Sequence, residues 1–284
     1  MAKVALVTDS TSYIPKELLK NVDLHIVPTI VIWAGEEMRD GVDIQPGEFY
    51  KRLASASEMP TTSQPTPNDF KTVYEKIVTG GQKDILSMHV SAKLSGTIAS
   101  AQQAASMVTD ANVEIVDGKS ASMGTGWPLL QAAKAAGAGK SLKEVAEAAR
   151  KARDHSGVLL LVDTLEFLHR GGRIGGAQRF LGTALNLKPI LEVVDGAIEP
   201  VERVRTKSKA IARIVEVLEE RVAGRNPVRV ATIHANALDE AKQLKALVDE
   251  RLKPTESVIT DVSPSVGTHT GPATLGLAYM AGID

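Results

Sequence analysis

Val158-Leu159-Leu160-Leu161-Val162 is an unbroken apolar run of strand length, and a polar stretch with paired glycines follows it from Asp163 to Gly175. A continuous apolar run is typical of a strand in a parallel sheet, because helices cover both faces of such a sheet. Helical patterns lie on either side of this run, at Leu142–Ala152 and Ser208–Val222. This order of elements predicts an α/β protein.

The same alternation extends along the chain. The expected strands are Val4–Val7, Leu24–Ile32, Ile85–His89, Val113–Val116, Val158–Val162, Ile190–Val194, Ile198–Val204, Val228–Ile233 and Val258–Val262. The expected helices include Pro67–Val78, Ala99–Met107, Trp127–Ala136, Leu142–Ala152, Ser208–Val222 and Leu238–Leu252. One segment departs from the alternation, because Asp195-Gly196 between two apolar runs predicts an antiparallel hairpin.

We therefore expect two α/β domains, each a mostly parallel sheet flanked by helices, with the antiparallel hairpin in the second. A chain of 284 residues is long enough for two domains. The polar stretch Arg150–Gly157 contains the best boundary, which gives an N-terminal domain of residues 1–156 and a C-terminal domain of residues 157–284. A ligand would lie between them.

Composition narrows the class of protein. The chain is 43% hydrophobic and 24% charged, as in an ordinary globular protein, and its net charge of −1 argues against a nucleic-acid partner. It has no cysteine, which excludes disulfides, thiol catalysis and cysteine-bound zinc. With no signal-peptide pattern and no apolar run long enough to span a bilayer, we expect a soluble, cytoplasmic protein.

Motifs for the common cofactors are absent. Gly139-Lys140-Ser141 has the end of a phosphate-binding loop, but it follows a helical pattern and Lys134 stands where that motif needs glycine. It is better explained as a helix end, with Ser141 and Glu144 capping the next helix. No dinucleotide-binding glycine pattern follows the first strand, and the six histidines lack metal-ligand spacing. We therefore expect no cofactor and no metal.

Polar segments follow several of the expected strands. Thr8–Ser12 lies at the carboxyl end of the first strand, where open α/β sheets bind ligands, although it could equally cap a following helix. Pro60–Pro65 is a hydroxyl-rich loop that its prolines make stiff. Ser91–Thr97 opens a helix, whose unpaired N–H groups attract anions. There Ser95 is either a ligand contact or a cap, and Gly96 would let a ligand approach the backbone.

Two further residues are candidates for holding an anion. Arg173 follows the paired glycines of the polar stretch, and arginine suits a carboxylate or phosphate; the alternative is a solvated surface arginine. His269 lies between glycines and hydroxyls in a segment that we expect to be a loop leading into a terminal helix. It is either structural or a ligand contact.

Taken together, these segments resemble the DegV family, over nearly the whole chain and in family order. The matching words are Thr8-Asp9-Ser10-Thr11, Thr61-Thr62-Ser63-Gln64-Pro65, Ser91-x-x-Leu94-Ser95-Gly96-Thr97, Asp163-Thr164-Leu165-x-Phe167-Leu168-x-Arg170-Gly171-Gly172-Arg173-Ile174, Lys188-Pro189-Ile190 and Gly267-x-His269-x-Gly271-Pro272. Each motif alone is weak evidence for the family, but the occurrence of all of them in family order is specific. Ala273 departs from the pattern, since many relatives carry glycine there, and it would narrow the cavity near His269.

The resemblance implies a carrier that binds a long-chain, palmitate-like fatty acid between two domains. It is the carrier subunit of a bacterial fatty-acid kinase system and presents the carboxylate for conversion to an acyl phosphate, with transient contact at the membrane surface. Carried onto this chain, Thr62 and Ser95 would hydrogen-bond the carboxylate. Arg173 and His269 would complete the polar network, and Ser63 and Gly96 would contribute backbone groups. The carrier would catalyse nothing itself.

Two alternatives remain open from the residues. One is a serine-dependent hydrolase or transferase with Ser95 as nucleophile and His269 as base, although no carboxylate that would orient the histidine is evident. The other is a carrier or sensor for a different anionic amphiphile, because a helix N-terminus with an arginine does not distinguish carboxylate from phosphate.

Overall fold

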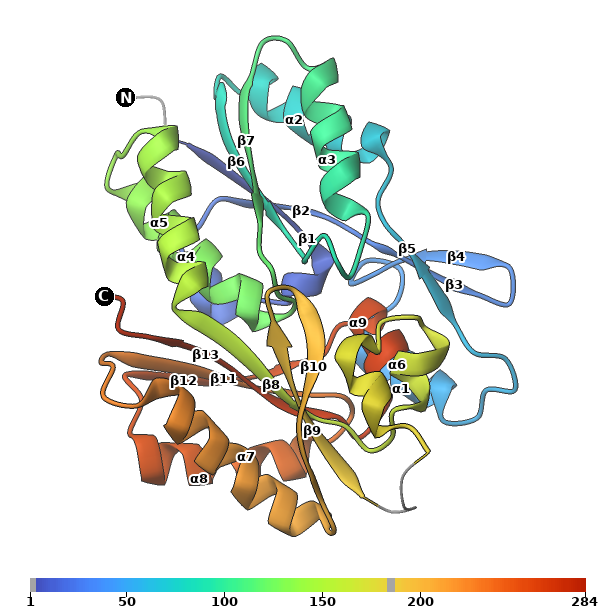
Figure 1. The fold of residues 1–284 in the computed structure, drawn as a ribbon. Coiled ribbons are helices and arrows are strands. Elements are labelled where there is room, and N and C mark those ends of the chain that lie inside the picture. The colour runs from blue at the N-terminus through green and yellow to red at the C-terminus, as the bar shows by residue number, and fades with distance from the viewer. Residues whose placement is uncertain (1–3, 183–186) are drawn as a thin grey trace.

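A parallel four-stranded sheet forms the first layer of the computed structural model, which describes residues 4–182 and 187–284. Its strand order is β2-β1-β6-β7, and every neighbouring pair is parallel. The strands are β1 (Ala5–Asp9), β2 (Leu24–Val27), β6 (Asp84–His89) and β7 (Asn112–Asp117). The predicted parallel α/β sheet in the N-terminal half is confirmed (Figure 1).

Helices cover both faces of this sheet. Leu6 of β1 packs in one core with α4 and α5, while Val7 packs in another core with α2 and α3. This alternation explains why the strand is apolar on both sides. The capping box that we expected at Ser141 and Glu144 is present and starts α5. The four helices are α2 (Pro67–Thr79), α3 (Thr97–Met107), α4 (Met123–Gly137) and α5 (Leu142–Asp154).

The second sheet has six strands in the order β10-β9-β8-β13-β11-β12. Only the pair β11–β12 is parallel; the other four pairs are antiparallel. The prediction of a mostly parallel sheet in the C-terminal half was therefore wrong. The strands are β8 (Ser156–Leu161), β9 (Lys188–Val194), β10 (Ala197–Val204), β11 (Val228–His234), β12 (Glu256–Asp261) and β13 (Leu275–Ala281).

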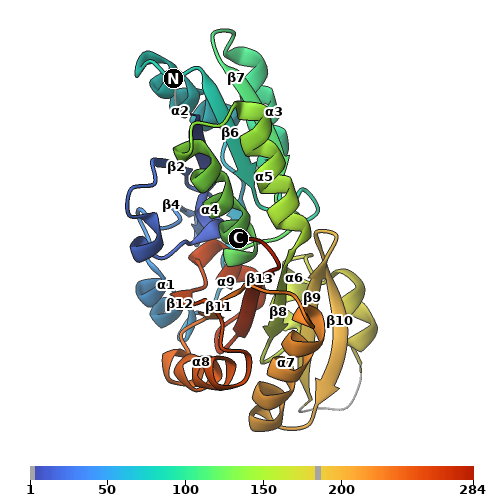
Figure 2. The same ribbon diagram turned by 90° about the vertical axis from the view of Figure 1, so that its left-hand side faces the viewer.

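The apolar run in β8 led to this wrong prediction. Such a run arises when both faces of a strand are buried, whatever the direction of its neighbours. Leu159 and Leu161 face a core shared with α7 (Lys207–Val222) and α8 (Leu238–Leu252), while Val158 and Leu160 belong to the core on the other face. Figures 1 and 2 show α7 and α8 along the lower face of this sheet, with the N-terminal half above it.

The end of the chain is a strand, not the terminal helix that we expected. Helix α9 (Pro264–Thr270) carries His269 and ends at Gly271, where φ is +78°. The following Leu275–Ala281 pairs with both β8 and β11 in the middle of the sheet. Its leucines, alanines and methionine favour helices in isolation, but pairing on both sides overrides that preference.

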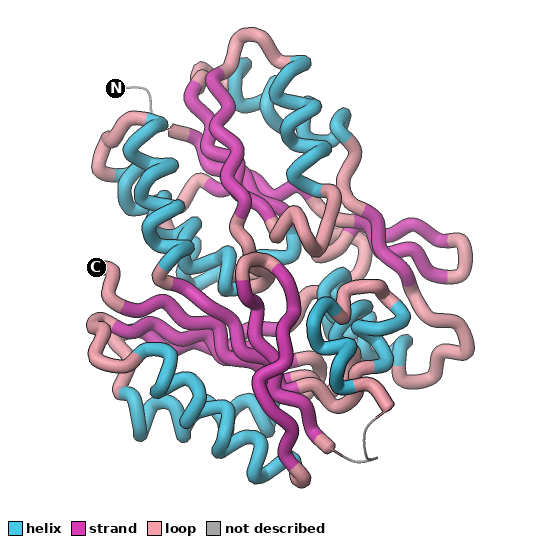
Figure 3. Tube along the Cα trace, in the orientation of Figure 1, coloured by secondary structure: helices cyan, strands magenta, loops and turns pink. Residues whose placement is uncertain are grey.

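A small third sheet divides what the sequence suggested was one strand over Leu24–Ile32. Pro28, which lacks an N–H group, follows β2, and β3 belongs to a different sheet. The strand order is β4-β3-β5, and all pairs are antiparallel. The elements in and near this sheet are β3 (Ile30–Trp33), β4 (Glu36–Arg39), α1 (Pro46–Leu53) and β5 (Thr61–Ser63). Figure 3 shows these strands at one side of the molecule.

The two halves of the chain meet at several places, for example where the Trp127 indole N–H of α4 donates to the Ala278 carbonyl of β13. Side chains of the small sheet and α1, such as Trp33 and Phe49, share a core with β8 and its neighbours. The predicted β9–β10 hairpin is confirmed, and its turn reaches the loop after β6, where Ser91 donates a hydrogen bond of 2.8 Å to the Gly196 carbonyl. The division of the chain into domains 1–156 and 157–284 stays a prediction.

Candidate functional site

A cavity of about 880 Å³, counting its mouth, lies between the first and second sheets. Its walls come from both halves of the chain, for example Thr11 and Val90 from the first sheet's edge and Leu160 and Ile233 from the second sheet. The cavity is the natural place to look for a binding site.

Five of the six residues that the resemblance assigns to the ligand line this cavity. They are Thr62, Ser63, Ser95, Arg173 and His269. The sixth, Gly96, stands next to the cavity. A Cβ atom there would lie 3.2 Å from the side chain of Gln64, which does line it. Ala273 does not contribute to the lining, so the narrowing that we expected from it is absent from this cavity.

Thr62 and His269, which are 207 positions apart, meet at the polar end of the cavity. Thr62 Oγ1 and His269 Nε2 are 2.8 Å apart and hydrogen-bonded. The other ring nitrogen, Nδ1, faces the backbone of Gly171, where an added Cβ would lie only 2.1 Å away. The first of the paired glycines therefore makes room for the histidine ring.

The His269 ring is neutral at physiological pH. Burial, together with the positive charge of Arg173, lowers the pKa of His269 to about 4. A neutral imidazole carries one N–H group. Among the described residues, Nδ1 has no hydrogen-bond partner, so the proton is better placed on Nε2, where it is donated to Thr62. In this tautomer the Thr62 hydroxyl proton remains available for an anion in the cavity.

We predict that NMR titration will show a pKa of about 4 for His269, so that half of the rings are protonated only near pH 4. In Arg173→Gln the pKa should rise, because a positive neighbour disfavours protonation, but remain below the ordinary histidine value because burial is the larger cause. An unchanged His269 titration in the variant would contradict a charge effect of Arg173 at this site.

Arg173 ties the two halves together at the polar end. Its Nε donates to the Leu94 carbonyl at 3.0 Å, and its Nη1 donates to the Gly171 carbonyl at 2.6 Å. Leu94 immediately precedes Ser95, so Arg173 also fixes the loop that carries this serine. The arginine is half-buried in the cavity wall and is not the solvated surface residue of the alternative interpretation.

Ser95 lies in the connection between β6 and α3, just before the helix begins. Its hydroxyl is 2.8 Å from Thr97 Oγ1 and accepts the Thr97 N–H at 3.3 Å. The residue at the cap position is Gly96, not Ser95. Ser95 thus hydrogen-bonds the first residue of α3 without being the cap of that helix, and it also lines the cavity. Its contact with a ligand stays a prediction.

The remainder of the cavity wall is largely apolar. The apolar side chains come from β8, β9, β10 and β11 and from the segments around them. They are Val158, Leu160, Leu168, Val193, Ile198, Ile233, Val262 and Val266. Polar groups and apolar wall therefore belong to one cavity, as an amphiphilic ligand requires.

A second cavity, of about 630 Å³, lies on the other side of the polar residues. It shares Thr62, Arg173 and His269 with the first cavity, and Phe167 and Arg170 also line it. The polar residues thus line both the first, largely apolar cavity and the second one, which are called the inner and the outer cavity below. A group held by them could be reached from the outer cavity.

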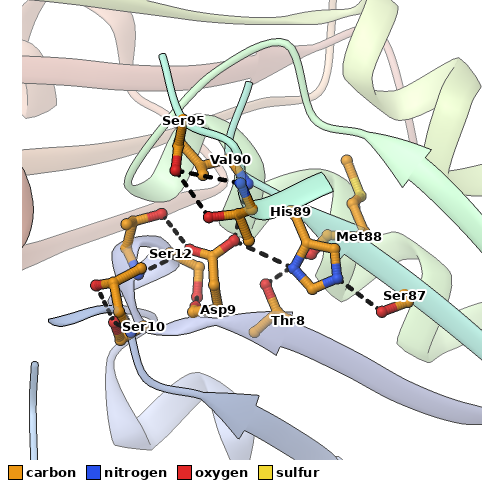
Figure 4. A network of polar contacts seen from close by, with 12 residues as sticks. Thr8, Asp9, Ser10, Ser12, Ser87, Met88, His89, Val90 and Ser95 are labelled. Atoms are coloured by element: carbon orange, nitrogen blue, oxygen red, sulfur yellow. Dashed lines mark hydrogen bonds and ion pairs between the residues drawn. The ribbon is translucent and has the colours of Figure 1, made fainter. Parts of the chain in front are cut away.

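A buried polar network, which no sequence pattern predicted, lies beneath the cavity edge (Figure 4). Asp9 Oδ2 is 3.2 Å from His89 Nδ1, and His89 Nε2 is 2.6 Å from Ser87 Oγ. Burial alone would raise the pKa of Asp9, but the bonds and charge from His89, with help from Thr11, lower it. Ser87 is fully buried and hydrogen-bonded to Tyr74, so the arrangement of Asp9, His89 and Ser87 has a structural role.

Asp9 also holds the cavity wall in place. Its carboxylate accepts the N–H of Val90 at 2.9 Å and the hydroxyl of Thr11 at 2.5 Å. Both Val90 and Thr11 line the cavity. In the Thr8–Ser12 segment, Asp9 therefore caps the short helix that follows it, and Thr11 contributes to the cavity lining.

A second buried carboxylate supports another part of the wall. Asp40 accepts hydrogen bonds from Ser10 at 3.0 Å and Thr29 at 3.2 Å. Burial raises the pKa of Asp40 to about 6, although these bonds and those from Ser265 oppose the shift. Thr29 and Ser265 are 2.6 Å apart and line the cavity. Of these residues, sequence reasoning singled out only Ser10, as part of Thr8–Ser12.

No group of three acidic or histidine side chains within residues 4–182 and 187–284 is arranged to hold a metal ion. No helix formed by these residues combines the length and the apolar character needed to cross a bilayer.

Comparison with known proteins gives matches over nearly the whole chain. Residues 3–282 match the model of a family described as "Uncharacterised protein, DegV family". The protein DegV of Bacillus subtilis is 35% identical over 282 residues, which cover 97% of this chain and 98% of that protein. A DegV domain-containing protein of Streptomyces coelicolor is 38% identical over 279 residues, covering 98% of each.

Solved structures agree with these matches. A structure from Thermus thermophilus, described as "Fatty Acid Binding of a DegV family Protein", has a TM-score of 0.92 at 36% identity and covers 98% of this chain and 99% of its own. The Bacillus subtilis structure, described as DegV, a fatty acid binding protein, has a TM-score of 0.90 at 33% identity and covers 99% and 100%.

Proposed function

The chain belongs to the DegV family, and from that premise we propose that it binds one long-chain fatty acid without changing it covalently. The carboxylate is held by Thr62, Ser95, Arg173 and His269, and the acyl chain lies against the apolar wall. The observation that carries this proposal is one cavity that combines these polar groups with a largely apolar lining. Relatives at 33% and 36% identity are described as fatty-acid-binding proteins.

The apolar wall supplies most of the affinity. Burying a ~16-carbon tail contributes about 0.8 kcal/mol per CH₂, or roughly 12 kcal/mol before the costs of ordering. A hydrogen bond to a charged group contributes only ~1.5–3 kcal/mol. The polar residues therefore fix where the carboxylate lies rather than whether the ligand binds.

At the head group, hydroxyl donors and a positive charge act together. The His269 Nε2–H orients Thr62, whose hydroxyl then donates to one carboxylate oxygen, and Ser95 donates to the other. Arg173 neutralises the negative charge, and the backbone near Ser63 and Gly96 adds N–H groups. Two hydroxyl donors and a guanidinium match a carboxylate well, because each of the two carboxylate oxygens then has its own hydrogen-bond donor.

We further propose that the carrier presents this carboxylate to a fatty-acid kinase, which converts it to an acyl phosphate. The outer cavity supports this step, since it opens onto the same Thr62, Arg173 and His269 that hold the carboxylate. The acyl chain can remain in the inner cavity while the head group is modified from outside. Cytoplasmic location and a brief contact with the membrane surface fit this role and stay predictions.

Ser95→Ala tests the presentation step. We expect the variant to keep bound lipid, because the tail is unaffected, but to support kinase turnover roughly 100-fold more slowly, as a misplaced reacting group does. The measurement is acyl-phosphate formation by a bacterial fatty-acid kinase with ATP, alongside native mass spectrometry of the loaded carrier. Ser106→Ala, on the exposed surface of α3, is the matched control. Equal turnover for Ser95→Ala and wild type would refute the role of Ser95.

A serine hydrolase has less support from the geometry. A general base must hydrogen-bond its nucleophile. His269 Nε2 instead bonds Thr62, and the Ser95 hydroxyl bonds Thr97. Covalent labelling of Ser95 by a fluorophosphonate would favour the hydrolase, whereas recovery of intact fatty acid without labelling favours the carrier.

A further inference from the structure

Ser122 places a hydroxyl in the cavity wall at a position that fatty-acid binding as proposed above does not use. It lies in the connection between β7 and α4, directly before the helix begins at Met123. Only 3% of the residue is exposed, and it lines the cavity. Ser122 and Ser95 belong to different connections, because Ser95 lies between β6 and α3.

The hydroxyl of Ser122 has no hydrogen-bond partner among the described residues. Other hydroxyls of the same cavity do have partners: Thr62 bonds His269, Ser265 bonds Thr29, and Thr270 bonds the Val266 carbonyl at 3.3 Å. A buried polar group without a partner is unfavourable and uncommon in folded proteins. Ser122 is thus available to a polar atom of whatever occupies the cavity.

The surroundings of Ser122 favour a neutral, electronegative partner. Helix α4 has 15 residues, and its N-terminus carries a partial positive charge that favours an electronegative atom. Ala121, which precedes Ser122 in the lining, is apolar, and the apolar Val158 of the lining lies close to Gly124, near the start of the same helix. A second carboxylate would be costly to bury beside these residues without a cation, whereas a hydroxyl would not.

We propose that the cavity accepts fatty acids whose chain carries a hydroxyl group, and that Ser122 is the residue that recognises this group. The inference rests on the proposed function and deepens it, since it names the class of acyl chain. The carboxylate at Thr62 and Ser95 fixes one end of the ligand. A chain hydroxyl at Ser122 then fixes a second point, so that only certain positions of the hydroxyl along the chain fit.

A series of hydroxyhexadecanoic acids, substituted at successive carbons, tests this with unsubstituted hexadecanoic acid as reference. Affinities are measured by displacement of a fluorescent fatty acid. One isomer, or two adjacent ones, should bind roughly 10-fold more tightly than the other isomers, as a single added hydrogen bond allows. In Ser122→Ala this preference should disappear, while the affinity for hexadecanoic acid changes by less than about twofold.

Two further variants complete the design. Ser122→Gly also removes the hydroxyl and suits the backbone, since φ is +52° at this position, so it replaces Ser122→Ala if that variant folds poorly. Thr270→Val, whose hydroxyl is already paired, should keep the isomer preference. Equal binding of all isomers, or a preference that survives in both Ser122 variants, overturns the inference. Failure of hexadecanoic acid itself to bind overturns the proposed function as well.

Discussion

Replacing Val193 by tryptophan is expected to weaken fatty-acid binding by roughly 100-fold. Val193 lies on β9, is only partly buried and lines the cavity, so the larger ring can enter the space without disrupting a closed core. An indole that excludes about four methylene groups removes ~3 kcal/mol of tail burial, which corresponds to roughly 100-fold in Kd. Displacement of a fluorescent fatty acid measures this loss.

The next residue provides the control. Val194 is 48% exposed, and neighbouring strand residues point to opposite faces. Val194→Trp therefore adds the same ring to the same hairpin outside the cavity, and its affinity should stay near that of the wild type. Equal affinities for the Val193 and Val194 variants would mean that the acyl chain does not occupy the space beside Val193.

Arg173→Gln is expected to weaken the binding of a fatty acid by roughly 10- to 100-fold, the value of one charge-assisted hydrogen bond. The methyl ester of the same acid has no negative charge, so its affinity should change little. The wild type should therefore prefer the acid over the ester, and the variant should lose most of that preference. Isothermal titration with both ligands measures it.

Arg170→Gln is the matched control for this substitution. Arg170 lies three residues before Arg173 and forms a solvent-exposed ion pair with Glu166. It does not line the inner cavity. It should keep the wild-type preference for the acid. If Arg173→Gln weakened acid and ester equally, Arg173 would be acting on the fold, through Leu94 and Gly171, rather than on the carboxylate.

The fold could be predicted from the sequence where local patterns decide it. Pro67 and Thr66 start α2, Ser141 starts α5, and Asp195-Gly196 adopts positive φ values of +46° and +84° in the hairpin turn. These features depend on a few neighbouring residues. Strand direction depends on partners far along the chain, and this is why the second sheet and the final strand Leu275–Ala281 were predicted wrongly.

The site could be predicted only in part for the same reason. The resemblance singled out Thr62, Ser95, Arg173 and His269, and the fold brings them to one cavity. No local pattern predicted that His269 would lie on a helix and form a hydrogen bond with Thr62. Nor did any pattern predict that Gly171 would leave room for the His269 ring. Ser122 was missed because the expected helix Trp127–Ala136 begins later in the chain, whereas α4 begins at Met123 and the Ser122 side chain before it caps nothing.

Native mass spectrometry of the purified chain tests the central claim most directly. The account predicts a mass above that of the polypeptide by one long-chain fatty acid, which denaturing extraction releases unmodified and which reappears when a lipid-free sample is mixed with palmitate. A chain that carries no lipid and takes up none from an excess of palmitate would contradict it.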